Sequence, residues 1–113
     1  MGMIFLIAKD ILFGSKFAGY AASRSKTFSI VKDPARLRDV EARLSQSDGM
    51  IVIIDLMFHE SNPLDFIGRV GKTARVIAYG PHVELELLQK ARELGAEAFP
   101  RGAIIQLLPQ LLG

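Results

Sequence analysis

Two acidic residues, Asp10 and Asp55, stand where charge is not expected, because each follows an apolar run. Asp55 comes directly after the aliphatic residues 51–54, and Asp10 is separated from the run IFLIA only by Lys9. An unbroken apolar run is typical of a strand buried on both faces, so each acid marks the end of such a strand. Because such a strand ends at a solvated crevice, the two carboxylates could meet at one site and bind a ligand there.

The elements that must position these acids alternate along the chain. Short apolar runs predict five strands, at Met3 to Ala8, Thr27 to Val31, Met50 to Leu56, Arg75 to Tyr79 and Ala98 to Phe99. Amphipathic patterns and capping residues predict five helices: Ile11 to Ser23, a second from Asp33 and Pro34, a third from SNPLDF to GRVGK, His82 to Leu94, and GAIIQLLPQLL. Because no linker rich in Pro, Gly or Ser divides them, we expect residues 1–113 to form a single domain.

Strands that alternate with helices need crossover connections, which are right-handed in nearly all proteins. The economical fold is therefore a flavodoxin-like, doubly wound α/β domain, with a five-stranded parallel sheet in the order 2-1-3-4-5 between two layers of helices. In such a sheet ligands bind outside the carboxyl ends of the first and third strands, where Asp10 and Asp55 would converge. The alternative that both acids only cap helices stays open.

Composition narrows the classes of partner. Fourteen basic and twelve acidic residues leave a net charge of +2, which is too small to drive binding to nucleic acid or anionic lipid, so neither a nucleic acid nor a membrane is the expected partner. The absence of cysteine excludes disulfides, thiolate metal sites and cysteine nucleophiles, and it suits a cytoplasmic protein. The run IFLIA is too short for a membrane span or a signal-peptide core.

Three segments carry a resemblance to a known family. KARELGAEAF follows ARVIAYG near the end of the chain, and VIIDLM contains Asp55. With these segments the chain resembles the response-regulator receiver (CheY-like) domains over nearly all of its length. The resemblance implies the fold described above, assigns the role of phosphoacceptor to Asp55, and implies Mg²⁺ as the cation that such a phosphoacceptor uses.

The chain departs from that family at the other positions of the family's active site. The two adjacent acids that hold Mg²⁺ in receivers correspond to Lys9 and Asp10, and the hydroxyl residue after the fourth strand corresponds to Gly80. The lysine after the fifth strand corresponds to Gly102, or to Arg101 if one residue is deleted. The residues expected in the crevice are Lys9, Asp10, Asp55, Gly80 and Arg101.

An ammonium about 4 Å from Asp55 would gain roughly 4 kcal/mol of attraction at an effective dielectric constant near 20, before desolvation is subtracted. Lys9 would then replace the cation. We therefore interpret the chain as a degenerate receiver, or pseudo-receiver: a non-enzymatic signalling or scaffold domain that uses no cofactor or metal and acts by protein contacts, independently of phosphorylation. Two alternatives remain open: Asp55 is phosphorylated in a divergent site in which Asp10 helps to hold Mg²⁺, or a small molecule or nucleotide binds in the crevice.

The last predicted helix has a wider apolar surface than one sheet face requires from a short helix. The residues concerned are Ile104, Ile105, Leu107, Leu108, Leu111 and Leu112. A homodimer or another protein would cover the excess, with Leu108 and Leu112 as interface residues, and simple core packing is the alternative.

Two further groups of residues match known functional motifs only weakly. GRVGKT lacks the first glycine of the phosphate-binding loop, because Phe66 stands there, and it leads into a strand instead of a helix. His59 and His82 could lie near Asp55, and Glu86 follows His82 at a spacing that could share a metal, but no third ligand is evident. We expect these three to be ordinary exposed side chains.

Overall fold

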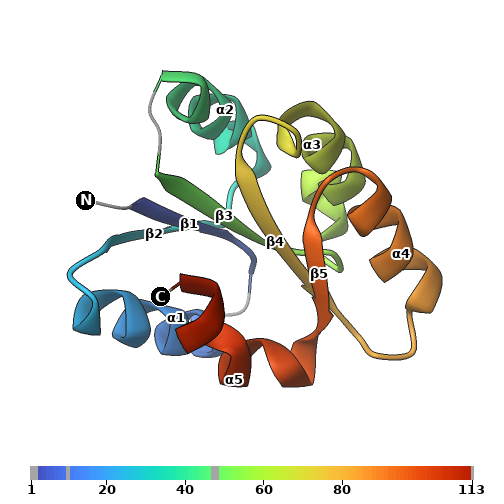
Figure 1. The fold of residues 1–113 in the computed structure, drawn as a ribbon. Coiled ribbons are helices and arrows are strands. Elements are labelled where there is room, and N and C mark those ends of the chain that lie inside the picture. Colours follow the sequence, from blue (N-terminus) through green and yellow to red (C-terminus); the bar gives the residue numbers. More distant parts are fainter. Residues whose placement is uncertain (1–2, 10, 47–48, 113) are drawn as a thin grey trace.

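A computed structural model describes residues 3–9, 11–46 and 49–112, and the fold is the predicted one (Figure 1). Five parallel strands form one sheet in the order β2-β1-β3-β4-β5. They are β1 (Met3–Ile7), β2 (Thr27–Val31), β3 (Met50–Asp55), β4 (Arg75–Gly80) and β5 (Glu97–Pro100). The central strands β1, β3 and β4 are mostly buried apolar runs, as a sheet covered on both faces requires.

Helices cover both faces of this sheet and give three layers (Figure 1). One face carries α1 (Ile11–Ser23) and α5 (Arg101–Leu112), and the other carries α2 (Leu37–Gln46), α3 (Pro63–Val70) and α4 (Leu85–Glu93). Two short 3-10 turns, η1 (Pro34–Arg36) and η2 (His59–Ser61), precede α2 and α3. The predicted cap is confirmed, because the side chain of Asp33 accepts a hydrogen bond from the Ala35 N–H at 3.0 Å.

The fourth helix begins later than the sequence pattern predicted. Residues between β4 and Leu85 form a turn, in which the N–H of Glu84 donates to the carbonyl oxygen of Pro81 at 3.0 Å. No side chain caps the start of α4. The turn therefore takes up His82 and Val83, and both are exposed.

The core is divided between the two faces of the sheet. On the face under α1 and α5, the rings of Phe17 and Tyr79 stack with centroids 6.2 Å apart, in one cluster with Ile104 and Leu108. On the opposite face, β1, β3 and β4 form a second cluster with residues of α2, α3 and α4, among them Phe66. Burial of large apolar side chains on both faces is the main favourable term in the stability of this sheet.

The position of α5 corrects one predicted interface residue. Leu108 is only 2% exposed and belongs to the core cluster, so it cannot serve as an interface residue of the folded chain. The side chain of Leu112, the second predicted interface residue, lies outside the part that the structure describes. Leu108 therefore packs in the core. Binding of a protein partner or formation of a homodimer stays a prediction, and Leu108 is no longer part of the expected interface.

Two glycines allow the ends of α3 and α4 to touch. Gly95 follows α4 with φ +110°, and a Cβ built on it would lie 2.6 Å from the carbonyl oxygen of Gly71, the residue after α3. A Cβ on Gly71 would in turn collide with the carbonyl oxygen of Leu94. Since real Cβ atoms do not approach oxygen so closely, this contact between two backbones requires glycine on both sides.

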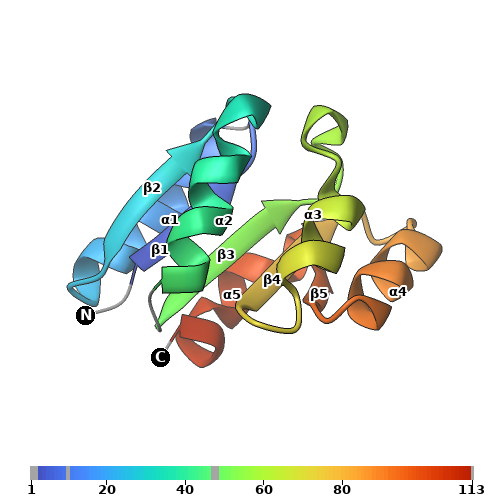
Figure 2. The same ribbon diagram turned by 90° about the horizontal axis from the view of Figure 1, so that it is seen from above.

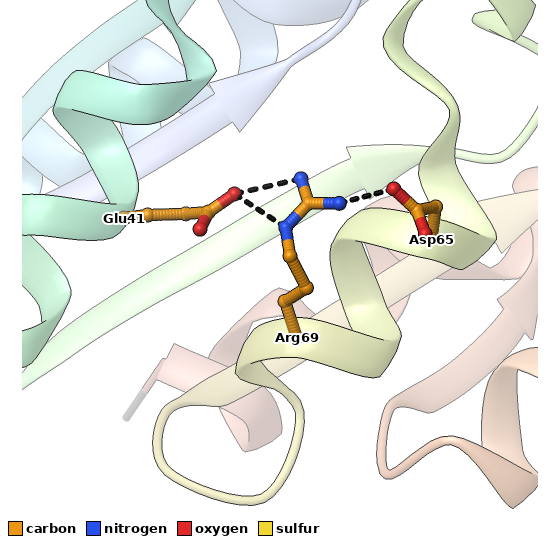
Figure 3. A network of polar contacts seen from close by, with 3 residues as sticks. All are labelled: Glu41, Asp65 and Arg69. Carbon is orange, nitrogen blue, oxygen red and sulfur yellow. Dashed lines mark hydrogen bonds and ion pairs between the residues drawn. The ribbon is translucent and has the colours of Figure 1, made fainter.

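An ion-pair network ties α2 to α3 on the surface (Figure 3). The Arg69 guanidinium donates from Nε to Oε1 of Glu41 at 2.8 Å, and it also pairs with Asp65 one turn earlier on α3. The hydrogen bond to Glu41 is the main cause that raises the pKa of Arg69 above its usual range. Arg69 thereby compensates the charge of Asp65 at the first turn of α3.

Candidate functional site at the carboxyl edge of the sheet

The strand register brings the predicted crevice residues to one edge of the sheet. Ile7 of β1 pairs with Ile54, so Lys9 lies just beyond the level of Asp55. Asp55 pairs with Tyr79, Gly80 pairs with Pro100, and Arg101 follows directly. The fifth predicted residue, Asp10, lies outside the described residues.

Asp55 ends β3 as a half-buried side chain whose carboxylate is turned to its own loop. Its Oδ1 accepts a hydrogen bond from the Met57 N–H at 2.8 Å, and its carbonyl oxygen accepts one from the Phe58 N–H at 3.1 Å. The intervening Leu56 is buried, and its N–H donates to the carbonyl oxygen of Tyr79 at 2.9 Å. The carboxylate thus shapes the turn that follows β3, as aspartate side chains do in Asx turns.

Lys9 does not pair with Asp55, which corrects the partner predicted from the sequence. Its ammonium forms an ion pair with Glu60 of η2 and lies 5.4 Å from the centre of the Phe58 ring. Phe58 is buried, whereas Lys9 and Glu60 are both exposed. The lysine therefore links the loop after β1 to the loop after β3 across the edge of the sheet.

The ion pair with Lys9 changes the acidity of the Glu60 carboxyl. The hydrogen bond from Lys9 is the main cause that lowers the pKa of this carboxyl below its usual value of 4.5. A carboxyl whose pKa is lowered by folding adds stability above its unfolded pKa, and that contribution is lost as the pH falls through the folded pKa. Because both groups are exposed, solvent screens the contribution and keeps it small.

We expect the variant Lys9→Met to return the pKa of Glu60 towards 4.5, because it removes the charged donor and keeps a long apolar stem beside Phe58. A titration of the Glu60 carboxyl carbon by NMR measures the shift. Any stability difference between the two proteins should be present at pH 7 and absent well below the pKa of Glu60. Lys16→Met, at an exposed position on α1, is the matched control, and an equal shift of Glu60 in that variant would contradict the assignment.

Gly80 lies in an apolar environment at the end of β4. The residue is buried, and a Cβ built on it would stand 3.6 Å from Cβ and Cδ1 of Leu56 and 3.9 Å from Leu88. These are ordinary contact distances, so the site would accept a small side chain, and the residue present supplies no hydroxyl. Arg101 is exposed at the start of α5, next to the half-buried Phe99 and Pro100.

The described residues at this edge offer few oxygen ligands for Mg²⁺. They include two carboxylates, Asp55 and Glu60, of which Glu60 forms an ion pair with Lys9, whereas Mg²⁺ requires several oxygen ligands in near-octahedral geometry. Within residues 3–9, 11–46 and 49–112, no three histidine or acidic side chains are grouped so that they could share a metal ion. His59, His82 and Glu86 are exposed.

Sequence reasoning missed Glu60 and Phe58 as parts of this edge. Both stand in the segment DLMFHE directly after β3, and their acidic and aromatic types were a signal that a cation could bind there. The distance along the chain from Lys9 hid the pairing, because only η2 turns Glu60 back towards the loop after β1.

Comparison with solved structures identifies the fold. The chain is similar to the receiver domain of TorR, the response regulator of the TMAO respiratory system, with a TM-score of 0.77 and 14% sequence identity. The alignment covers 99% of this chain and 98% of that one. No family model and no curated protein sequence matches the chain. Among the helices that the structure describes, none combines the length and the apolar character needed to cross a bilayer.

Proposed function

We propose that this receiver-fold domain works as a non-enzymatic signalling or scaffold module that acts through protein contacts, independently of phosphorylation. The observation that carries the proposal is the position of Lys9. Its ammonium lies beside Glu60 and Phe58, at the edge where a receiver would need a second acid for Mg²⁺. A fixed positive charge there opposes the binding of a divalent cation.

The chemistry of phosphoryl transfer supports the same conclusion. Charge that develops on a transferred phosphoryl group is normally neutralised by a metal ion, which the described donors do not fit. The Asp55 carboxylate accepts a hydrogen bond from the Met57 N–H, so one of its oxygens already has a structural partner. Gly80 offers no hydroxyl that could follow a phosphoryl group.

The signalling role rests on the likeness of fold, and a fold hosts more than one function. TorR is a response regulator, and its receiver domain shares the architecture of this chain at 14% identity. In this proposal the domain is cytoplasmic, as its lack of cysteine suits, and binds a protein partner or a second copy of itself. It uses no cofactor.

Incubation with a small acyl phosphate and Mg²⁺, followed by intact mass spectrometry, tests the proposal. We expect the mass to stay unchanged, because the described residues of the site offer too few oxygen ligands to hold the cation. The TorR receiver domain, treated in parallel, serves as the reference for the reagent. Asp55→Asn serves as the control that locates any modification.

Two outcomes would overturn the proposal. A gain of one phosphoryl group that is lost in Asp55→Asn would show a working receiver with a divergent site. Saturable binding of a nucleotide or a metabolite that is lost in the same variant would show a small-molecule site in the crevice. Each outcome corresponds to one of the alternatives that the sequence leaves open.

A further inference from the structure

An open groove runs between the start of α3 and the first turns of α4, which lie side by side (Figure 2). It consists of two adjoining hollows of about 410 and 420 Å³ that share Leu64, Leu87 and His59. Leu56 lies in one hollow and Met57 in the other. We call this surface the α3–α4 groove. It is separate from the Lys9–Glu60 contact, although η2 borders both.

Apolar side chains line this groove, among them the exposed Met57. In the part of the chain that the structure describes, the large apolar residues that are exposed are Met57 (39%), Val83 (70%) and Leu85 (71%). Met57 lines the groove, and Val83 and Leu85 flank Glu84, which also lines it. An apolar surface of this kind with a polar rim is typical of a site where another protein binds.

The charges of the rim indicate the chemistry of the partner. Glu84 and Glu86 line the groove, and neither forms an ion pair with another described residue. Asp65 is compensated by Arg69, and Lys90 supplies one positive charge. Unpaired carboxylates beside exposed apolar side chains are complementary to a surface that carries both lysine or arginine and apolar anchors.

A second copy of this chain fits the groove poorly. A two-fold contact through the groove would bring Glu84 and Glu86 of both copies into one interface against only two copies of Lys90. Like charges placed together across an interface cost free energy. The same carboxylates disfavour a nucleic acid or an anionic membrane surface.

We infer that the α3–α4 groove binds a basic amphipathic helix of a partner protein. The walls of the groove come from α3, α4, η2, the loop after β3 and the turn before α4, none of which is a strand edge, so an extended peptide would gain no ladder hydrogen bonds. A helix carries its own satisfied backbone and presents apolar anchors at spacings of three and four residues, which suits two adjoining hollows. The inference rests on the proposed function, since it names the surface through which such a module makes its protein contact.

The probe for this site is a synthetic helix of roughly 15 residues with one leucine face and flanking lysines, a length at which an isolated helix becomes marginally stable. A peptide of the same composition in scrambled order is the control ligand. Titration into the full, isotope-labelled chain, followed by amide chemical shifts, should give saturable binding with the largest shifts at Met57, Leu64 and Leu87. The scrambled peptide should bind at least about 5-fold more weakly, because it lacks a continuous apolar face.

Matched variants test the residues of the groove. Glu86→Lys should weaken binding by about 5-fold or more, and Met57→Gln by a similar factor, because the first reverses a rim charge and the second removes exposed apolar surface from the lining. Glu93→Lys makes the same charge change on α4 at an exposed residue that does not line either hollow. It should leave the dissociation constant within about 2-fold of the original, as expected for a charge outside the contact. All three positions are exposed, so the variants should remain folded.

The inference is overturned if no saturable binding occurs at millimolar peptide, if the shifts fall on another surface, or if Glu93→Lys weakens binding as much as Glu86→Lys. The titration is repeated after treatment with acyl phosphate and Mg²⁺, with the mass measured in the same sample. Binding in the groove only after a phosphoryl gain would overturn the proposed function and support the groove. Unchanged mass without binding would overturn the groove and support the proposed function.

Discussion

Replacing Leu108 by Glu should lower the free energy of unfolding by at least about 4 kcal/mol and leave little cooperative folded protein at room temperature. Leu108 is 2% exposed in the cluster between the sheet and α5. The change removes a buried apolar side chain, and the loss of such a side chain alone costs about 2–5 kcal/mol when leucine becomes alanine. It also adds a carboxylate, which must either be buried at a cost in free energy or displace α5 from the sheet. Urea denaturation followed by circular dichroism measures the loss.

Gln106→Glu is the matched control for this variant. It introduces the same carboxylate on the same helix at an exposed position, so its stability should stay within about 0.5 kcal/mol of the original. If Leu108→Glu instead kept its full stability and only dissociated an oligomer, Leu108 would be an interface residue and the assignment of α5 to the core would be wrong.

Replacing Gly95 by Ala should cost about 3 kcal/mol and lower the melting temperature by roughly 10 °C or more. At φ +110° an L-residue is strained, and the new Cβ would meet the carbonyl oxygen of Gly71 at 2.6 Å. The obstacle is backbone, which cannot rotate away as a flexible side chain would. Relief requires α3 and α4 to separate at their carboxyl ends.

Gly19→Ala provides the opposite expectation from the same substitution. Gly19 lies inside α1, is exposed, and a Cβ built on it meets nothing within 4 Å. The change should raise stability by about 0.5–1 kcal/mol, because alanine loses less backbone entropy in a helix. A calorimetric comparison that found both variants equally destabilised would contradict the contact between Gly71 and Gly95.

The sequence was sufficient for the fold because each element had a local signal and the connections follow general rules. The apolar run before Asp55 marked a central strand, and the Asp33-Pro34 pair marked the start of a helix. Right-handed crossovers then predicted a parallel sheet with helices on both faces, and the expected strand order 2-1-3-4-5 is confirmed by the structure. The start of α4 was predicted too early. A hydrogen-bonded turn at Pro81 precedes the helix, and the spacing of apolar residues does not distinguish such a turn from a first helical turn.

Leu108 was wrongly predicted to lie in an interface because the two faces of the sheet are covered by different numbers of helices. Two helices, α1 and α5, cover one face of the sheet, whereas three cover the other (Figure 1). Each helix of the pair must therefore bury a wider apolar surface, and Ile104, Leu108 and Leu111 are all taken up by the core. Counting apolar residues on α5 alone could not reveal how much area its face of the sheet requires.

The candidate site was predictable only as far as the strands determine it. Register fixed the common edge of Lys9, Asp55, Gly80 and Arg101, since each comes at or just after the end of a parallel strand. The partner of Lys9 depended on η2, whose conformation has no periodic signal in the sequence. Pair interactions between exposed loops therefore required coordinates, whereas positions at strand ends did not.

The parallel pairing throughout the sheet also bears on how fast the chain can fold. Because parallel strands cannot be joined by a tight hairpin, the pairing of Met3 with Met50 closes a long loop that contains α1, β2 and α2. The entropy of closing such loops is lost before the contacts that repay it form, so folding should be slower than for a helical bundle of equal length. During synthesis one edge of β4 stays unpaired until β5 has been made. The slow step and the moment of greatest exposure to aggregation thus both follow from the same strand order.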